Sequence, residues 1–144
     1  MSLKMDEKTV EDFLLNGRIL RMASVNKDGS PHIVPVWYLY ENGKFYFTTN
    51  VNHVKVKNIK NMNKVAFTID VGKGYSDLKG VIVHGIAKVT LEPEFFTDKF
   101  NKIISKYVGD LNHRVAKELL TMDNCVIEIT PYKKISWDFG KIWG

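Results

Sequence analysis

A cluster of cations is the first feature of this sequence that could carry chemistry. Residues 50–67 contain four lysines and a histidine but no acidic residue. Within them, residues 52–62 show a helical period. The apolar side of this predicted helix, which should face the core, holds Val56, Ile59 and Met62. The opposite side, which should be a solvated charged face, holds Lys57, Lys60 and Lys64.

Lys55 differs from these lysines because the same period places it on the inward side, in the first turn. The helix dipole puts about half a positive charge at that end, so a cation there is unfavourable unless an anion lies beside it. First-turn backbone N–H groups and polar side chains are the donors that phosphate groups seek. The polar side chains that lead into this helix are Thr48, Thr49, Asn50, Asn52 and His53. A bound phosphate is one hypothesis; the alternative is that Asn52 only caps the helix while Lys55 extends into water.

Two apolar segments need something other than solvent to cover them. Residues 32–40, HIVPVWYLY, carry apolar or aromatic side chains on both faces, and Pro35 cannot donate to a strand ladder, which predicts an edge or a bulge. A flat aromatic ligand, a subunit interface or burial on both faces of a small barrel would each provide cover. Trp137, Phe139 and Trp143 near the chain end are likewise expected to dock.

Other site chemistries find little support. The four histidines lack metal-ligand spacing, so no metal is expected, and no G-x-S-x-G motif supplies a nucleophile. Gly72-Lys73-Gly74 matches neither a P-loop nor a dinucleotide fingerprint. No residue is identified as catalytic. The net charge of +5 permits an anionic partner, and a nucleic-acid-binding barrel is a second hypothesis because strand aromatics could stack on bases. These aromatics are Trp37, Tyr38, Phe45 and Tyr46.

The length and composition favour a single domain over residues 1–144, of which 44% are hydrophobic. Cys125 is the only cysteine, so an internal disulfide is excluded and a reducing, cytoplasmic location is expected. No apolar run reaches the roughly 18 residues that would predict a membrane span.

The elements that must position these residues are mostly strands. Alternating or apolar patterns predict six of them, at residues 18–25, 32–40, 44–49, 65–70, 80–92 and 125–137. Gly85 interrupts the long fifth strand and suggests a bulge. Helices are predicted at residues 9–15, 52–62, from Pro93 to about residue 107, and near 112–120. The predicted fold class is mainly β (α+β), a six-stranded antiparallel barrel with peripheral helices.

Four stretches in this order resemble one known family: RILRMASVNKDGSPHIVPVWYLYENGKFYFTTN, HVKVKNIKNMNKVAFTID, GVIVHGIAKV and ITPYKKISWDFG. Over about residues 13–139 the chain resembles the pyridoxamine 5'-phosphate oxidase-like, FMN-binding split-barrel family. The resemblance implies a homodimer with FMN between the subunits and an oxidoreductase that acts on a small molecule. The implied cofactor contacts are Val34, Pro35 and Val36 for the ring, Thr48, Thr49 and Asn50 for the ribityl chain, Lys55 and His53 for the phosphate, and Trp137 to complete the pocket.

Departures from the family pattern bear on the substrate. Pyridoxamine phosphate oxidases carry an arginine where this chain has Val54, and further arginines near the carboxyl end, whereas the last arginine here is Arg114. No histidine follows His113, which disfavours the haem-degrading branch. A deazaflavin (F420)-using reductase and a flavin-binding protein without turnover stay open as alternatives.

Overall fold

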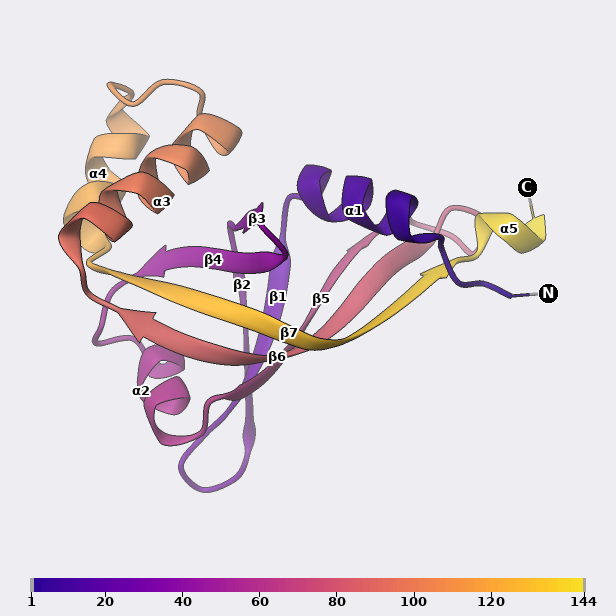
Figure 1. Ribbon diagram of the computed structural model, residues 1–144, viewed down its shortest axis with the longest axis horizontal. Coiled ribbons are helices and arrows are strands. Elements are labelled where there is room, and N and C mark those ends of the chain that lie inside the picture. The colour runs from indigo at the N-terminus through magenta and orange to yellow at the C-terminus, as the bar shows by residue number, and fades with distance from the viewer. Residues whose placement is uncertain (1, 144) are drawn as a thin grey trace.

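The computed structural model describes residues 2–143, except for the side chain of Trp143, whose expected docking therefore lies outside the described part. Its centre is one antiparallel sheet of seven strands in the order β2-β1-β5-β6-β7-β4-β3. The strands are β1 (Leu20–Val25), β2 (Pro31–Val36), β3 (Leu39–Glu41), β4 (Lys44–Thr49), β5 (Lys64–Val71), β6 (Lys79–Thr90) and β7 (Cys125–Asp138). The sheet curls strongly around its inner face (Figure 1). This confirms the predicted fold class, a split β-barrel with peripheral helices.

The strand predicted at residues 32–40 is in fact two strands, which raises the count from six to seven. β2 pairs with β1, whereas β3 pairs with β4 at the opposite edge of the sheet. The break falls at Tyr38, whose backbone is held from outside the sheet: its N–H donates to the Tyr107 hydroxyl at 3.0 Å, and its carbonyl accepts from Lys106 Nζ at 3.1 Å. The chain from Trp37 to Tyr38 therefore crosses the seam of the barrel.

The edge position predicted for Pro35 is confirmed, because β2 is the last strand of the sheet on its side. Pro35 lies opposite Arg21, and its side chain is on the outer face. Because β2 has a neighbour on one side only, a residue without an N–H is tolerated there. Val34 and Val36 lie opposite Met22 and Leu20, which are fully buried, and therefore face the inside of the barrel.

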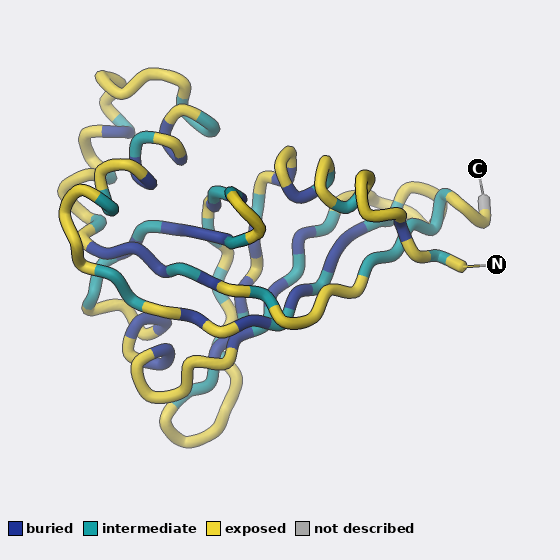
Figure 2. Tube along the Cα trace, in the orientation of Figure 1, coloured by how far each residue is buried: buried dark blue, intermediate teal, exposed yellow. Residues whose placement is uncertain are grey.

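The core is formed by the inward-facing side chains of the sheet, and Figure 2 shows the buried residues along its strands. Alternate residues of five strands point into it, among them Met22, Phe45, Phe47, Phe67, Val83 and Ile127. The bulge predicted at Gly85 is confirmed by a shift in the β6–β7 register between His84 and Gly85. A Cβ atom at Gly85 would lie only 2.6 Å from Cγ2 of Ile129, so glycine is required where the two strands approach most closely.

The helices sit at the ends and on the outer side of the barrel. α1 (Glu7–Asn16) leads into β1 and is capped by Asp6, which accepts from the Thr9 N–H. α3 (Pro93–Tyr107) and α4 (Arg114–Met122) join β6 to β7 and lie over β4 at one end of the sheet (Figure 1). α2 (Val54–Asn61) follows β4 directly, and α5 (Gly140–Trp143) follows β7. Over residues 2–143, no helix combines the length and the apolar character that crossing a membrane requires.

Candidate functional site

Helix α2 places Lys55 against the protein interior, as its period predicts. Lys55 is only 8% exposed, and its helix neighbours Val56 and Ile59 belong to the core. Lys57 and Lys60 are exposed on the other side, in agreement with a solvated face. The inward placement of Met62 is wrong: α2 ends at Asn61, so Met62 adopts an extended conformation and is 43% exposed. Lys64 is also exposed, but it opens β5 rather than the helix.

The ammonium group of Lys55 has a histidine as its nearest polar partner. Its Nζ lies 3.2 Å from Nδ1 of His53, which in turn lies 3.1 Å from Oγ1 of Thr49. Among the side chains that the structure describes, Lys55 has no carboxylate within ion-pair distance. Burial lowers the pKa of Lys55, and the more distant carboxylate of Asp123 partly opposes this shift. Lys55 is therefore a desolvated cation in need of an anion.

The alternative in which Asn52 caps the helix is wrong. The N-cap residue of α2 is His53, and no side chain caps the first turn. Asn52 is exposed, and its backbone N–H donates to Oδ1 of Asn50 at 2.8 Å. Lys55 is buried rather than extended into solvent. The Lys55 ammonium group lies beside the N-cap residue His53, at the end of α2 where the first-turn N–H groups are. An ammonium group and helix N-terminal N–H groups together favour the binding of an anion.

Two adjacent threonines at the end of β4 form hydrogen bonds with different partners. Thr49 is 3% exposed and hydrogen-bonds His53, whereas Thr48 donates to Oδ2 of Asp123 at 2.8 Å. Alternate strand residues point to opposite faces, so the pair separates the surroundings of Lys55 from those of Asp123. Asn124 fixes the connecting loop, since its N–H donates to the Thr49 carbonyl and its Oδ1 accepts from the Val51 N–H.

Asp123 is a site residue that sequence reasoning missed. It forms the C-cap of α4 and is half-buried, and burial raises the pKa of its carboxyl group, against the opposing effects of the Thr48 hydrogen bond and of nearby Lys55 and His53. One signal could have found it: an acidic residue directly after a helix whose last turn holds no basic residue. Such a residue adds to the negative end of the helix dipole instead of compensating it.

A cavity of about 150 Å³ connects the predicted ring contacts with the predicted ribityl contacts. Val36 enters it from β2 and Thr48 from β4, while α3 and α4 form its outer wall together with Asp123. The structure thus brings Val36, Thr48, Thr49, His53 and Lys55 to one end of the barrel. Val34 faces the inside of the barrel opposite Met22 and does not line this cavity, whereas Pro35 lies on the outer face, as does Ile33, which is 68% exposed.

Trp137 is not part of this end of the molecule within one chain. β7 begins with Cys125, which pairs with Thr49, and ends near Trp137, which pairs with Gly80. At about 3.3 Å per residue, the twelve steps from Cys125 to Trp137 span up to roughly 40 Å. Figure 1 shows the two ends of β7 on opposite sides of the molecule. Phe139 follows there and is half-buried, with an edge-to-face contact to Tyr75.

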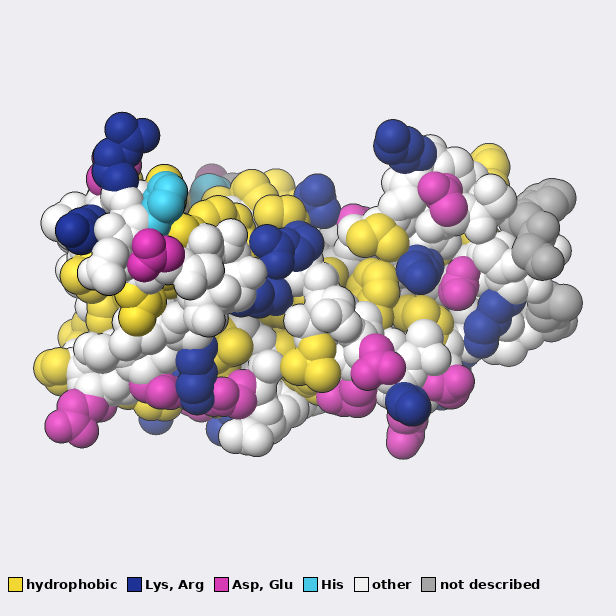
Figure 3. All heavy atoms as spheres, turned by 90° about the horizontal axis from the view of Figure 1, so that it is seen from above, with side chains coloured by type: hydrophobic (Ala, Val, Ile, Leu, Met, Phe, Trp, Pro, Cys, Tyr) yellow, Lys and Arg dark blue, Asp and Glu magenta, His cyan; other side chains and the backbone are white. Residues whose placement is uncertain are grey.

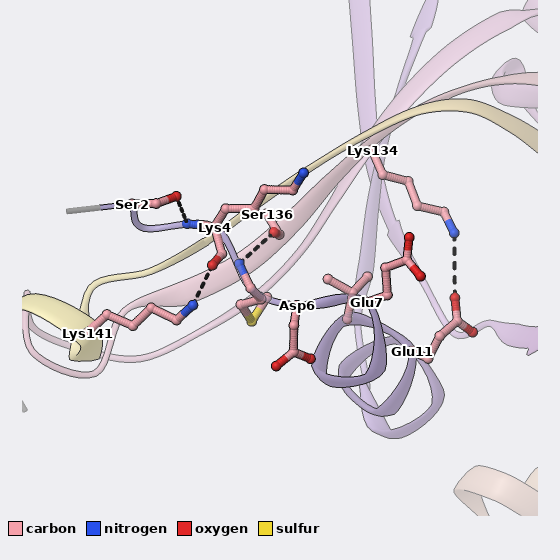
Figure 4. A pocket seen from close by; sticks show the side chains of 10 residues that line it. Ser2, Lys4, Asp6, Glu7, Glu11, Lys134, Ser136 and Lys141 are labelled. Atoms are coloured by element: carbon pink, nitrogen blue, oxygen red, sulfur yellow. Dashed lines mark hydrogen bonds and ion pairs between the residues drawn. The ribbon is translucent and has the colours of Figure 1, made fainter.

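A larger hollow of about 770 Å³ lies near that far end, between α1 and β7 (Figure 4). None of the predicted cofactor contacts lines this hollow, although Lys134 and Ser136 of β7 do. Several of its polar groups already have partners: Lys134 lies 3.7 Å from Glu11, Ser136 Oγ accepts from the Met5 N–H at 3.0 Å, and Lys141 donates to the Lys4 carbonyl. Because this hollow is lined by both acidic and basic side chains, its charges do not favour an anion, whereas the surroundings of Lys55 do.

Solved structures with the same fold support these assignments of architecture. A conserved hypothetical protein from Mycobacterium tuberculosis is 25% identical, covers 100% of this chain and 92% of its own, and superposes with a TM-score of 0.87. An F420 reductase is 23% identical over 86% of this chain and 94% of its own, with a TM-score of 0.67. An FAD-binding protein from Mesorhizobium loti is 18% identical over 92% and 94%, with a TM-score of 0.70.

The sequence itself gives a family assignment. No curated protein matches it significantly. The profile of the family described as pyridoxamine 5'-phosphate oxidase matches residues 6–137, which include every strand of the sheet except the last residue of β7. This match and the curled antiparallel sheet agree with the resemblance found in the sequence, and the chain therefore belongs to the pyridoxamine 5'-phosphate oxidase family.

Proposed function

We propose that this protein binds FMN and acts as an oxidoreductase on a small molecule, with the cofactor phosphate held at Lys55. The observation that carries the proposal is the burial of Lys55 in the first turn of α2, where no carboxylate of the described residues pairs with it. A buried cation without a counter-ion is unfavourable, and at a helix N-terminus it is more so. A phosphate would satisfy the ammonium group and the unpaired first-turn N–H groups together.

The side chains around Lys55 suit the rest of a phosphorylated ribityl chain. Thr49 and His53 form a connected polar series with Lys55, and Asn50 follows Thr49 in the loop. Thr48 lies beside them on the other face of β4, where its hydroxyl donates to Asp123. Hydroxyl and amide groups are donors and acceptors that match a polyol. Because β4 and the loop are fixed by β7 through Asn124, these groups are pre-positioned before any ligand arrives.

The flavin ring is proposed to lie along β2, against Val34, Pro35 and Val36. The cavity beside Val36, at about 150 Å³, is smaller than the roughly 300–1,000 Å³ of a usual cofactor pocket. One chain therefore supplies only part of the enclosure. A second copy of the chain would complete it and would bring Trp137, which a single chain leaves far from Lys55.

The outer face of the sheet supports such a homodimer. Ile33 of β2, Ile86 of β6 and Ile135 of β7 are 68%, 37% and 42% exposed, and the strand register places all three on the side away from the core. Apolar side chains gathered on one sheet face are typical of an interface.

The bound flavin would supply a ring that accepts or gives a hydride, while the protein binds, orients and shields it. The chain itself would contribute the positive charge of Lys55 near the phosphate and the apolar side chains of Val34 and Val36 near the flavin ring. Val54 is 49% exposed and uncharged where vitamer oxidases carry an arginine, so the substrate is proposed to differ from pyridoxamine phosphate. F420 is the second cofactor candidate, and flavin binding without turnover is the alternative to an enzyme.

A cytoplasmic location accords with the buried free thiol of Cys125.

Nucleic-acid binding through strand aromatics is not supported. Tyr38 and Phe45 are fully buried and Tyr46 is 6% exposed, which leaves Trp37 alone of the four to meet a base. On the face shown in Figure 3, acidic and basic side chains are interspersed rather than collected into a basic groove. A low net charge spread in this way does not favour a polyanion.

The proposal is tested by the visible absorption spectrum of the pure protein and by titration with FMN, with F420 in parallel. We expect a flavin spectrum and saturable binding of FMN. Lys55→Ala should weaken binding by at least tenfold, because a charge-assisted hydrogen bond is lost. Lys57→Ala is the matched control, since it removes the same charge from the exposed side of the same helix and should leave affinity within about twofold. Equal affinities of the two variants would refute the phosphate assignment.

A further inference from the structure

The cavity beneath α3 and α4 has features that a flavin phosphate site does not explain. We refer to it as the cap pocket. Its walls are apolar and come from the barrel seam and both helices: Val36, Trp37, Phe100, Ile103, Ile104 and Leu119. The only other residues that line it are Thr48 and Asp123. A carboxylate in an otherwise apolar pocket is a specific recognition element, since such a group is costly to desolvate without a partner.

The carboxylate of Asp123 has one bonded partner and spare capacity. Oδ2 accepts from Oγ1 of Thr48 at 2.8 Å, and within the described chain no cation lies within ion-pair distance of either oxygen. A carboxylate can accept about four hydrogen bonds, so most of its capacity is unused. The pocket side of Asp123 can therefore take an additional donor.

The potential around Asp123 favours a cation as that donor. Asp123 is the C-cap of α4, where the helix dipole contributes about half a negative charge, and no basic residue in the last turn compensates it. Lys55 and His53 influence Asp123 from a distance but belong to the other side of the β4 end, with Thr49.

Size restricts the ligand further. A cavity of about 150 Å³ has room for a group of the size of a benzene ring. The ring of Trp37 is held in place by stacking on Tyr107, with centroids 4.6 Å apart, so this wall is rigid. A ligand with one ring or a short branched chain therefore fits.

We propose that the cap pocket binds a small apolar ammonium compound, with its cationic head at Asp123 and its apolar body between Trp37, α3 and α4. Its role as the substrate of the oxidoreductase rests on the proposed function, because the pocket shares Val36 and Thr48 with the proposed flavin contacts. Its role as a binding site does not, and can be tested on the protein without cofactor.

The test compares three ligands of nearly equal shape: benzylamine, benzyl alcohol and benzoate. Affinity is measured by calorimetry, with tryptophan fluorescence as a second readout because Trp37 lines the pocket. We expect benzylamine to bind at least tenfold more tightly than benzyl alcohol, and benzoate to bind most weakly. Asp123→Asn should abolish the preference for the amine, and Asp123→Glu should retain part of it. Glu118→Gln, an exposed acidic residue on the same helix, is the matched control and should change nothing.

A volume variant separates packing from charge. Leu119→Phe adds bulk to the pocket wall and should weaken benzylamine and benzyl alcohol together, while circular dichroism checks that each variant is folded. The proposal is overturned if benzylamine binds no better than benzyl alcohol or if Asp123→Asn leaves the preference intact. A failure of FMN to bind, with the amine preference preserved, would overturn the proposed function alone.

Discussion

The aromatic rings of Trp37 and Tyr107 lie almost parallel, with centroids 4.6 Å apart and an interplanar angle of 9°. This contact joins the seam of the barrel to the last turn of α3. The Tyr107 hydroxyl reinforces it, because it accepts from the Tyr38 N–H at 3.0 Å and donates to the Arg18 carbonyl at 2.8 Å. Tyr107 thus helps to fix α3 over the cap pocket, because its side chain satisfies backbone groups on both sides of the seam.

Loss of that hydroxyl should destabilise the fold without removing the ring stack. In Tyr107→Phe, the backbone N–H of Tyr38, a fully buried residue, loses its acceptor, and we expect the free energy of unfolding to fall by about 1–3 kcal/mol. Urea denaturation measures this. Tyr75→Phe is the control, since Tyr75 is 77% exposed and the same change there should have little effect. An unchanged midpoint for Tyr107→Phe would show that water replaces the hydroxyl.

Lys55 should cost stability in the protein without cofactor. Because it is a buried cation that pairs with no carboxylate in the described chain, Lys55→Met should raise the free energy of unfolding of the apo-protein by roughly 1 kcal/mol. The same variant should lose FMN affinity, so stability and binding change in opposite directions. Lys57→Met, on the exposed side of α2, should stay within about 0.5 kcal/mol of the parent. A destabilised Lys55→Met apo-protein would mean that Lys55 has a structural role instead.

Lys106 should make stability depend on pH in a defined window. Burial, with help from Arg18, lowers the pKa of Lys106 from 10.5 to about 8. The unfolded chain therefore binds more protons than the folded protein between pH 8 and 10.5, and the contribution of Lys106 to stability rises with pH across that range. The measurement compares denaturation midpoints at pH 7.5 and 9.5 for the parent and Lys106→Met. We expect the variant to lack this increase; parallel curves would contradict the shift.

Glycine at position 85 should be required by packing rather than by backbone conformation. A Cβ atom there would lie 2.6 Å from Ile129 Cγ2 and 2.9 Å from the Thr130 carbonyl oxygen. Gly85→Ala should therefore destabilise the protein by about 1–3 kcal/mol, the range for overpacked positions. Gly74→Ala is the control because its nearest neighbour would be 3.8 Å away. Thermal denaturation of both variants decides the matter, and equal losses would refute the packing explanation.

Local patterns were sufficient to predict most of the elements. The helical period of residues 52–62 correctly placed Lys55 inward, and the interruption at Gly85 correctly marked the bulge. Both features depend on neighbours along the chain or on one adjacent strand. Pro35 at an edge is of the same kind, because a missing N–H restricts a strand position wherever it occurs.

Features that depend on distant segments escaped prediction. The division of residues 32–40 results from Tyr107 and Lys106, which hold the Tyr38 backbone from almost 70 residues away. Asp123 could not be recognised as a site residue because its hydrogen-bond partner, Thr48, lies 75 residues earlier in the chain. The sequence also does not show that Trp137 and Lys55 lie far apart, since their separation depends on the length and path of β7 in the folded sheet. Such relations are set by tertiary packing, which no window of the sequence contains.

The place of β7 between β6 and β4 has a consequence for the order in which the protein can be made. β4 pairs only with β3 and β7, and its partner Cys125 lies 76 residues after Thr49. While the chain leaves the ribosome, the β3–β4 hairpin has no sheet to join until residues 125–129 have been synthesised. Strands β1, β2, β5 and β6 can assemble earlier. The contact between Thr48 and Asp123, and with it the cap pocket, is thus among the last parts of the molecule to form during translation.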